Sequence, residues 1–304
     1  MEQMKLTVLG CNSALPTIRN FQTSQLLSLR EKQFMIDCGE GAQIRMRQMK
    51  LKATRLNHIF ISHLHGDHCF GLIGLISTFG LLGRTADLVI HAHADLEKLL
   101  QPQIDYYCAD KGYQVLFEPF NSRQHSLLYE DRSVQVFSIP LKHRVPTAGF
   151  LFAEKERERH IIREMIDFYH IPVKDIARVK QGEDFVTPEG EVILNERLTT
   201  MPTPPKRYAY CSDTAYSEKI IPWIENVDLL YHEATFMQRE IARAKETCHS
   251  SARQAAEIAK AANVKQLIIG HFSARYDNPN YLLEEALEVF PHTILAFDGM
   301  KIDV

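Results

Sequence analysis

The chain has 304 residues, of which 45% are hydrophobic and 24% charged, which is the composition of a globular protein that buries a sizeable core. Its formal net charge of -3 excludes nucleic-acid binding through a global positive field, while a local basic patch stays compatible with it. The six cysteines contain no Cys-x-x-Cys pair, which is typical of reduced thiols in a cytoplasmic protein.

No segment of the sequence has the properties of a membrane anchor. Residues 1–10 alternate polar with apolar side chains and predict a first strand rather than a signal peptide. The longest uncharged run, 69–83, contains four glycines and is shorter than the roughly 20 apolar residues that a membrane helix needs. We therefore expect a cytoplasmic protein without membrane contact.

Strand and helix patterns alternate along the chain. β-patterned segments predict strands at 5–10, 33–37, 58–62, 88–91, 134–139, 148–152, 207–211, 229–232, 266–270 and 293–297. Apolar residues at helical spacing predict helices at 42–49, 68–82, 95–107, 251–262 and 281–289. This order predicts an α/β fold with two sheets and helices outside them.

One stretch interrupts the pattern. It opens with the charge run 154–159, contains a short helical pattern at 161–169 and closes with Pro202, Pro204 and Pro205. A charge run by itself indicates a solvated face. We interpret the chain as one domain, 1–304, with an inserted arm at 153–199.

The strongest chemical signal directly follows the predicted strand 58–62. It comprises His63, His65, Asp67 and His68, four potential metal ligands within six residues. In an extended segment side chains at i and i+2 point the same way, so His63 and His65 can bind one ion while Asp67 and His68 face a second. Imidazole and carboxylate suit zinc, with manganese and other divalent ions as competitors.

A site with two metals needs ligands from elsewhere in the chain, and strand ends are where such a fold exposes side chains. His143, Asp213 and His271 each stand just beyond a predicted strand. Polar residues are common at strand ends, so each is weak evidence alone. Together with the four ligands above they complete two coordination spheres.

Further motifs resemble those of the tRNase Z family, the 3′-tRNA-processing endoribonucleases of the metallo-β-lactamase superfamily. The resemblance runs along nearly the whole chain and rests on Asp37-Cys-Gly-Glu-Gly41, His143-Arg-Val-Pro-Thr-Ala-Gly149, Ser212-Asp-Thr214, His232-Glu-Ala-Thr235, His249-Ser-Ser251 and Gly270-His-Phe-Ser-Ala-Arg-Tyr276. It implies an αββα four-layer sandwich whose inserted arm binds substrate. It also implies a zinc-dependent endoribonuclease that removes the 3′ trailer of precursor tRNA and leaves a 3′-hydroxyl.

The same resemblance assigns the ligands of two Zn²⁺ ions per chain. The first ion takes His63, His65 and His143; the second takes Asp67, His68 and His271; Asp213 bridges them. Two ions in this arrangement share a water and lower its pKa, which creates a nucleophile at neutral pH. Asp67 is implied as general base. Family members pair as homodimers, so a homodimer that binds precursor tRNA is expected here.

The leaving 3′ oxygen needs a proton, and His249 is the candidate donor. Ser251 and Gln254 form a capping-box pattern, so His249 lies just before a helix N-terminus, where a phosphate is favoured. A nearby carboxylate is required to keep that imidazole protonated, and Glu233 fills this role by resemblance too. From the residues alone, Glu233 as a helix cap and His249 as a surface loop residue are equally compatible with the pattern.

Other features have less specific readings. Asp37 is expected to brace the metal ligands rather than to bind metal. His91 and His93 form a second His-x-His pair, but no acid–His pair follows at metal-site spacing, so we interpret them as a polar strand end. The segment 45–55 carries five positive charges and no acid, which predicts either a phosphate-binding face or a solvated helix.

Two alternatives to tRNA processing stay open on sequence grounds. One is a phosphodiesterase with two metals that acts on small or cyclic phosphodiesters. The other is an RNA-binding subunit whose metals are only structural. The inserted arm favours a polymeric substrate, although it lacks the Gly-Pro-rich tip usual in the family.

Overall fold

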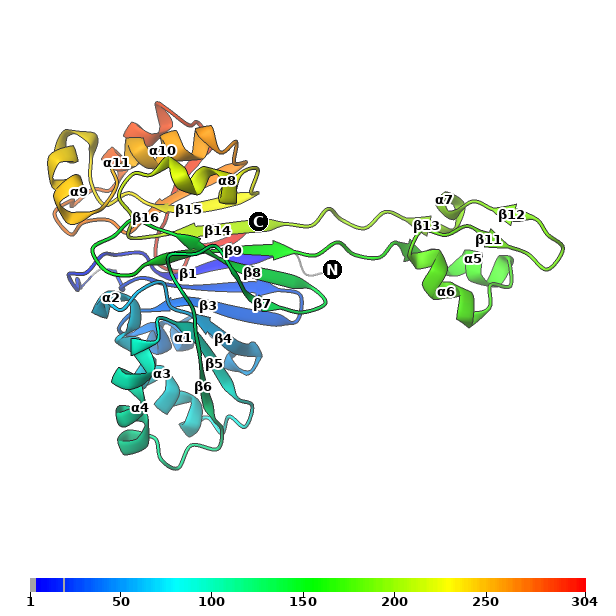
Figure 1. Ribbon diagram of the computed structural model, residues 1–304, viewed down its shortest axis with the longest axis horizontal. Helices are drawn as coiled ribbons and strands as arrows, with labels where there is room; N and C mark the ends of the chain where they lie inside the picture. Colours follow the sequence, from blue (N-terminus) through cyan, green and yellow to red (C-terminus); the bar gives the residue numbers. More distant parts are fainter. Residues whose placement is uncertain (1–3, 19) are drawn as a thin grey trace. The chain divides into compact units, whose positions relative to one another are not determined.

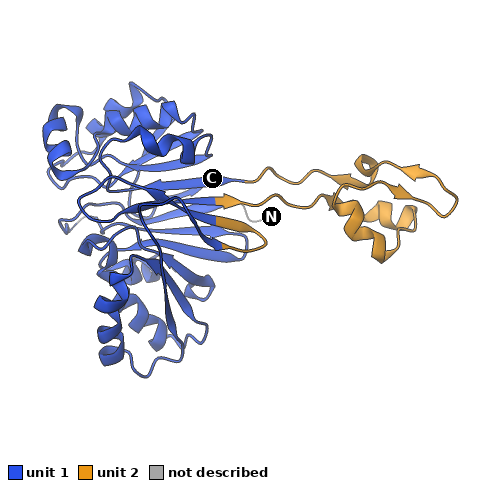
Figure 2. Cartoon of the chain, in the orientation of Figure 1, with its two compact units in different colours: residues 1–129, 136–152, 206–304 blue, residues 130–135, 153–205 orange. Residues whose placement is uncertain are grey.

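The computed structural model describes residues 4–18 and 20–304, so residues 1–3 of the predicted N-terminal segment lie outside the described residues. The chain divides into two compact units (Figure 2). Unit 1 comprises residues 1–129, 136–152 and 206–304, and unit 2 comprises residues 130–135 and 153–205.

The first sheet of unit 1 is formed mainly by the N-terminal half of the chain. Its seven strands are hydrogen-bonded in the order β18-β1-β2-β3-β4-β5-β6. The pairs β3–β4, β4–β5 and β5–β6 are parallel, while β18, β1, β2 and β3 pair antiparallel. The strands are β1 (Lys5–Gly10), β2 (Ser24–Leu29), β3 (Lys32–Cys38), β4 (Leu56–Phe60), β5 (Leu88–Ala92), β6 (Val115–Pro119) and β18 (Lys301–Asp303).

The second sheet is formed mainly by the C-terminal half, in the order β17-β16-β15-β14-β9-β8-β7. Strands β14 to β17 are all parallel to one another. Its strands are β7 (Leu127–Glu130), β8 (Val134–Pro140), β9 (Ala148–Glu154), β14 (Arg207–Cys211), β15 (Leu229–Glu233), β16 (Gln266–Gly270) and β17 (Thr293–Leu295).

Helices cover the outer face of each sheet in unit 1 (Figure 1). The first sheet is covered by α1 (Ala42–Gln48), α2 (Gly66–Cys69), α3 (Gly71–Leu81) and α4 (Asp95–Tyr107). The second is covered by α8 (Ile221–Ile224), α10 (Ala252–Ala261) and α11 (Asn280–Leu287), while α9 (Ile241–Thr247) lies beyond the ends of its strands. The predicted αββα sandwich is therefore confirmed.

The sandwich has more strands than the sequence pattern predicts. β2 was not predicted because its residues do not alternate: five of its six positions are buried, with apolar and small polar side chains mixed. A strand covered on both faces loses the period of two that marks a half-exposed strand. The predicted helix 68–82 is divided into α2 and α3 at Phe70, where a Cβ on Gly71 would lie 2.1 Å from the carbonyl oxygen of Gly39.

Unit 2 has a small hydrophobic core of its own. Ile171, Val179, Phe185, Ile193 and Leu198 are buried together. Its elements are β10 (His160–Ile161), α5 (Arg163–Phe168), α6 (Val173–Lys180), β11 (Phe185–Val186), β12 (Val192–Ile193), α7 (Asn195–Leu198) and β13 (Thr199–Thr200). The helical pattern predicted at 161–169 corresponds to α5, whereas α6 was not predicted.

Among the described residues, no helix combines the length and the apolar character required to cross a membrane.

Candidate active site

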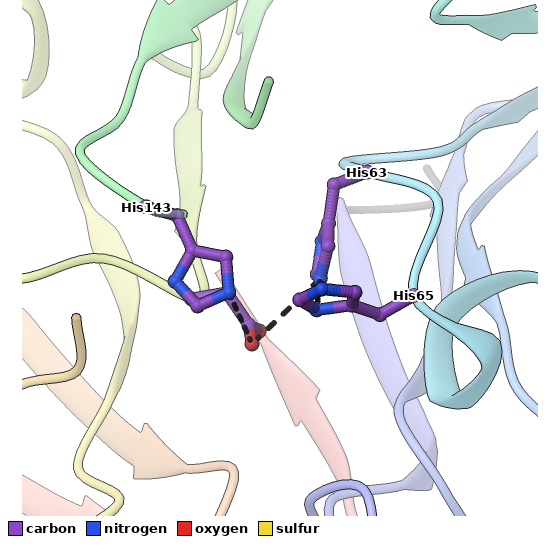
Figure 3. A group of neighbouring side chains, drawn as sticks. His63, His65 and His143 are labelled. Atoms are coloured by element: carbon purple, nitrogen blue, oxygen red, sulfur yellow. Dashed lines mark hydrogen bonds and ion pairs between the residues drawn. The ribbon is translucent and has the colours of Figure 1, made fainter. Parts of the chain in front are cut away.

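The four potential ligands after β4 are brought together by the turn into α2. His63 is fully buried and His65 is the extended residue that precedes the helix, while Asp67 and His68 lie within α2. Figure 3 shows that His63 and His65 come from one loop and face His143. His63 Nε2 lies 2.9 Å from His65 Nδ1, so both nitrogens point at the same position.

The parallel strands β14, β15 and β16 bring two more ligand candidates to one edge of the second sheet. Their register pairs Cys211 with His232 and His232 with Ile269, so the ends of the strands are level. Asp213 and His271 follow immediately with φ angles of 61° and 59°. This left-handed conformation is uncommon outside glycine and indicates a backbone held by its surroundings, which is frequent at functional sites.

All seven sequence-predicted ligands lie close together. His63, His65, His143 and Asp213 form one group whose potential ligand atoms lie within 4.8 Å of one another, and Asp67, His68 and His271 form a second such group. Asp213 also connects the groups: its Oδ1 lies 3.8 Å from His63 Nε2, and its Oδ2 lies 3.1 Å from His68 Nε2. A third group combines Asp213 and His271 with His249.

The imidazole rings are oriented by hydrogen bonds on the nitrogen that faces away from the cluster. Nδ1 of His68 contacts Asp37 at 2.7 Å, Nδ1 of His143 contacts the Cys248 carbonyl at 3.0 Å, and Nδ1 of His271 contacts Thr235 Oγ1 at 3.0 Å. The opposite Nε2 atoms of these three histidines are buried without a hydrogen-bond partner. Buried nitrogens of this kind, next to carboxylates, are what a bound divalent cation requires.

The charges of the cluster also favour a cation. Burial alone lowers the pKa of His68, but Asp213, Asp37 and Asp67 together raise it well above its usual value. Burial would raise the pKa of Asp213, yet the imidazoles of His271, His68 and His63 hold it well below its usual range. The carboxylates that attract a proton here would attract a metal ion in its place.

Asp37 braces the cluster, as the sequence analysis predicted. Its side chain is buried and accepts hydrogen bonds from the Ser62 backbone at 2.7 Å, from the Ser62 hydroxyl at 2.8 Å and from the Tyr210 hydroxyl at 2.6 Å, besides its contact with His68. The carboxylate therefore fixes both the ring of His68 and the backbone that leads into His63.

Replacing Asp37 with alanine is expected to weaken metal binding by about 10–100-fold, the usual effect of losing a group that orients a ligand. The ring of His68 would then lack the acceptor that fixes its tautomer. Titration of the metal-free protein with Zn²⁺ in a competing chelator measures the change. An unchanged affinity would show that His68 is held without Asp37.

Glu233 and His249 form a pair beside the two groups, in which the Glu233 side chain is fully buried and that of His249 is partly exposed. His249 Nδ1 lies 2.8 Å from Glu233 Oε1, and its ring is stacked 5.4 Å from that of His271. Burial alone lowers the pKa of His249, but the carboxylate of Glu233 raises it to about 9. The imidazole is thus protonated at neutral pH, with its other nitrogen left for the cleft.

Thr235 is a further residue of the site for which the sequence predicted no role. Its hydroxyl lies 2.5 Å from Glu233 Oε2 and 3.0 Å from His271 Nδ1, so it connects the proton-carrying pair with a metal-ligand candidate. Its place in the motif His232-Glu-Ala-Thr235 was the only feature of the sequence that pointed to this role.

The predicted capping box is confirmed, because Ser251 and Gln254 exchange both hydrogen bonds at the start of α10.

The site opens into a cleft of about 490 Å³. Its walls combine the two groups with arginines and small polar residues: Ser13, His65, Arg144, Asp213, Phe236, Arg243, Thr247, His249, His271 and Arg275 are among them. The positive side chains of the cleft suit a phosphodiester.

Two other histidines and the basic segment lie elsewhere. His91 is buried rather than a polar strand end, with its Nε2 3.1 Å from His58 Nδ1 and its ring stacked on Phe60. Arg47 and Lys50 line a separate groove next to α3, and Arg55 pairs with Glu31 at 2.8 Å.

Similar proteins cover the whole chain. Ribonuclease Z of Bacteroides fragilis is 60% identical over 304 residues, which are 100% of both chains, and ribonuclease Z of Porphyromonas gingivalis is 52% identical over the same span. A family model described as anti-Pycsar protein Apyc1 matches residues 4–112.

Solved structures support the fold. The short form of human tRNase Z superposes with a TM-score of 0.73 at 23% identity and covers 99% of both chains. The metallo-β-lactamase fold protein YhfI of Bacillus subtilis gives 0.69 at 20% identity and covers 100% of both. These two likenesses confirm the predicted fold. The full-length identity to curated ribonuclease Z proteins confirms the predicted family: the chain belongs to the ribonuclease Z family.

Proposed function

We propose that this member of the ribonuclease Z family removes the 3′ trailer of precursor tRNA with the help of two Zn²⁺ ions, and leaves a 3′-hydroxyl on the tRNA. The proposal rests on one observation: two groups of metal-ligand candidates lie beside the hydrogen-bonded His249–Glu233 pair at one cleft. Phosphodiester hydrolysis needs both a nucleophile and a proton donor.

In this proposal His63, His65 and His143 hold one ion, Asp67, His68 and His271 hold the other, and Asp213 contacts both. The pair of ions, when bound, supplies a nucleophile at neutral pH and neutralises charge on the phosphate. Asp67, whose Oδ2 lies 3.5 Å from His271 Nε2, accepts the proton of the attacking water. His249 donates its proton to the leaving 3′ oxygen, and Glu233 keeps it charged.

The test is to map the product ends of a labelled precursor tRNA, with and without chelator, beside a chromogenic phosphodiester. Precursor cleaved at one position, with a 3′-hydroxyl and only in the presence of metal, is the expected result. Hydrolysis of the small ester without cleavage of the precursor would favour a small-molecule phosphodiesterase. RNA binding without hydrolysis of either would leave a structural role for the metals.

The proposal includes a homodimer that works in the cytoplasm. Its support is a group of exposed apolar side chains on α3 and α4: Leu81 is 87% exposed, Tyr106 81% and Tyr107 68%. Apolar side chains gathered on a surface in this way are typical of a protein interface.

The proposed location in the cytoplasm is supported by the cysteines. All six are free thiols, as expected in a reducing compartment.

Unit 2 is proposed as the arm that holds tRNA. Acidic side chains outnumber basic ones in residues 153–205, so unit 2 does not attract phosphates through its net charge. Apolar side chains instead offer contact area: Phe168 is 72% exposed and Met201 70%. The residues proposed for catalysis all lie in unit 1.

Replacing residues 156–197 with a short flexible linker is expected to leave metal content and small-ester hydrolysis intact. Cleavage of precursor tRNA should fall mainly through a higher KM, because contacts that bind ground state and transition state equally affect KM alone. Steady-state kinetics on both substrates provide the measurement. Equal KM values for the shortened and intact proteins would assign tRNA binding to unit 1.

A further inference from the structure

Arg243 faces the cleft without an acidic partner. It lies on α9, whose residues 243 and 247 both line the cleft, as expected for positions four apart on a helix. The Thr247 hydroxyl donates to the Arg243 carbonyl at 2.9 Å, which holds the last turn of the helix. No ion pair of Arg243 occurs within residues 4–18 and 20–304.

The neighbouring Arg275 shows the contrast. Its Nη1 lies 2.6 Å from Glu240 Oε1, and its guanidinium lies 5.1 Å from the centre of the Phe236 ring. Arg275 is therefore held by protein groups on both sides. Arg243 is exposed on a cleft already rich in positive groups, so its charge is better balanced by a bound anion than by the protein.

The position of Arg243 along the RNA follows from His249. Helix α9 ends at Thr247, and His249 comes two residues later with its backbone N–H bonded to the Ala244 carbonyl at 2.8 Å. Helix and imidazole therefore form one side of the cleft. Since His249 protonates the leaving 3′ oxygen, the nucleotide that carries this oxygen lies on the same side, and its own 5′ phosphate is the next anion along the chain.

We propose that Arg243 binds the phosphate on the 5′ side of the nucleotide whose 3′ oxygen leaves. This inference rests on the function proposed above and adds a positioning residue to it. Two guanidinium N–H groups bind two phosphate oxygens side by side, which fixes the orientation of the nucleotide as well as its affinity. A chromogenic diester has no second phosphate and cannot use the contact.

The first test compares Arg243→Ala with Lys245→Ala in the full-length, metal-loaded enzyme. Lys245 is exposed on the same helix, two positions on, and does not line the cleft. We expect Arg243→Ala to raise KM for precursor tRNA by about tenfold, from the loss of a charge-assisted hydrogen bond. Hydrolysis of the chromogenic ester and metal content should not change, and Lys245→Ala should match wild type on all three.

The second test locates the phosphate. In an otherwise identical precursor, a neutral methylphosphonate replaces the phosphate 5′ of the cleaved nucleotide. Wild type should lose about as much on this substrate as Arg243→Ala loses on the normal one, and the variant should lose nothing further, because contacting groups are not additive. As a control, the methylphosphonate replaces the phosphate that follows the scissile phosphate in the trailer. This change should leave the difference between wild type and variant unchanged.

The outcomes separate this inference from the proposed function. Precursor cleavage by wild type with equal KM for Arg243→Ala and Lys245→Ala would overturn the role of Arg243 alone. A tenfold effect that persists in full on the 5′ methylphosphonate would place the contact elsewhere on the RNA and also overturn it. Failure of wild type to cleave any precursor would instead refute the proposed function.

Discussion

Replacing His65 with alanine is expected to reduce the metal content of the purified chain from two ions and to lower turnover of both substrates by about 10³ or more. The reason is that the group formed by His63, His65, His143 and Asp213 loses one of its nitrogens. A bound ion contributes several kcal/mol of charge stabilisation, and each 1.36 kcal/mol corresponds to a factor of ten. Elemental analysis of the purified protein, together with kinetics on the chromogenic ester, measures both effects.

His93 offers a matched control for this substitution. It is the second histidine of the other His-x-His pair, and its partly exposed ring lies 3.4 Å from Asp95 rather than near a ligand group. His93→Ala should keep two ions and full turnover. Active wild-type enzyme with one ion or none would refute the scheme of two metals, and an active His65→Ala with two ions would remove His65 from the ligand set.

The ligand cluster was predictable because its residues are local or stand at strand ends. Four of the seven ligand candidates lie within six residues, and parallel strands with level ends bring Asp213 and His271 to one edge. The spacing of residues 63–68 therefore provided most of the evidence from which the ligand cluster was predicted. What the sequence could not show is how the rings are oriented, because Asp37, Thr235 and the Cys248 carbonyl reach them only in the folded chain.

The fold was predictable where strands alternate or follow helices, and less so where they do not. β2 is buried along almost its whole length, so its polar and apolar residues show no period of two. β7 and β18 have only four and three residues, too few for a pattern to emerge. The interpretation of His91 as a polar strand end was wrong. Its contact with His58 joins the neighbouring parallel strands β4 and β5, and two residues so far apart in the sequence give no local pattern that predicts the contact.

His249→Ala should keep both metal ions and the fold while lowering turnover of precursor tRNA by about 10²–10⁴, the usual range for losing a general acid. His249 Nδ1 is held by Glu233, and His249 belongs to neither of the two groups into which the seven ligand candidates divide. The same variant should lose far less with a nitrophenyl ester, because nitrophenolate departs without a proton. Metal analysis accompanies the kinetics, and loss of zinc from the variant would reassign His249 to metal binding.

Glu233→Gln tests the same pair through pH. The carboxylate raises the pKa of His249 to about 9, so its imidazole is protonated below that value. If His249 is the acid, we expect turnover of precursor tRNA by wild type to decline as pH rises through that value. Without the negative charge, burial dominates and the pKa of His249 falls, so the alkaline decline should begin at lower pH. Rate profiles on the nitrophenyl ester should not show this displacement, because that reaction does not use the proton. A shift of equal size on both substrates would assign the titration to the attacking water, and Glu233 would then act on the metal cluster through Thr235 rather than on the leaving group.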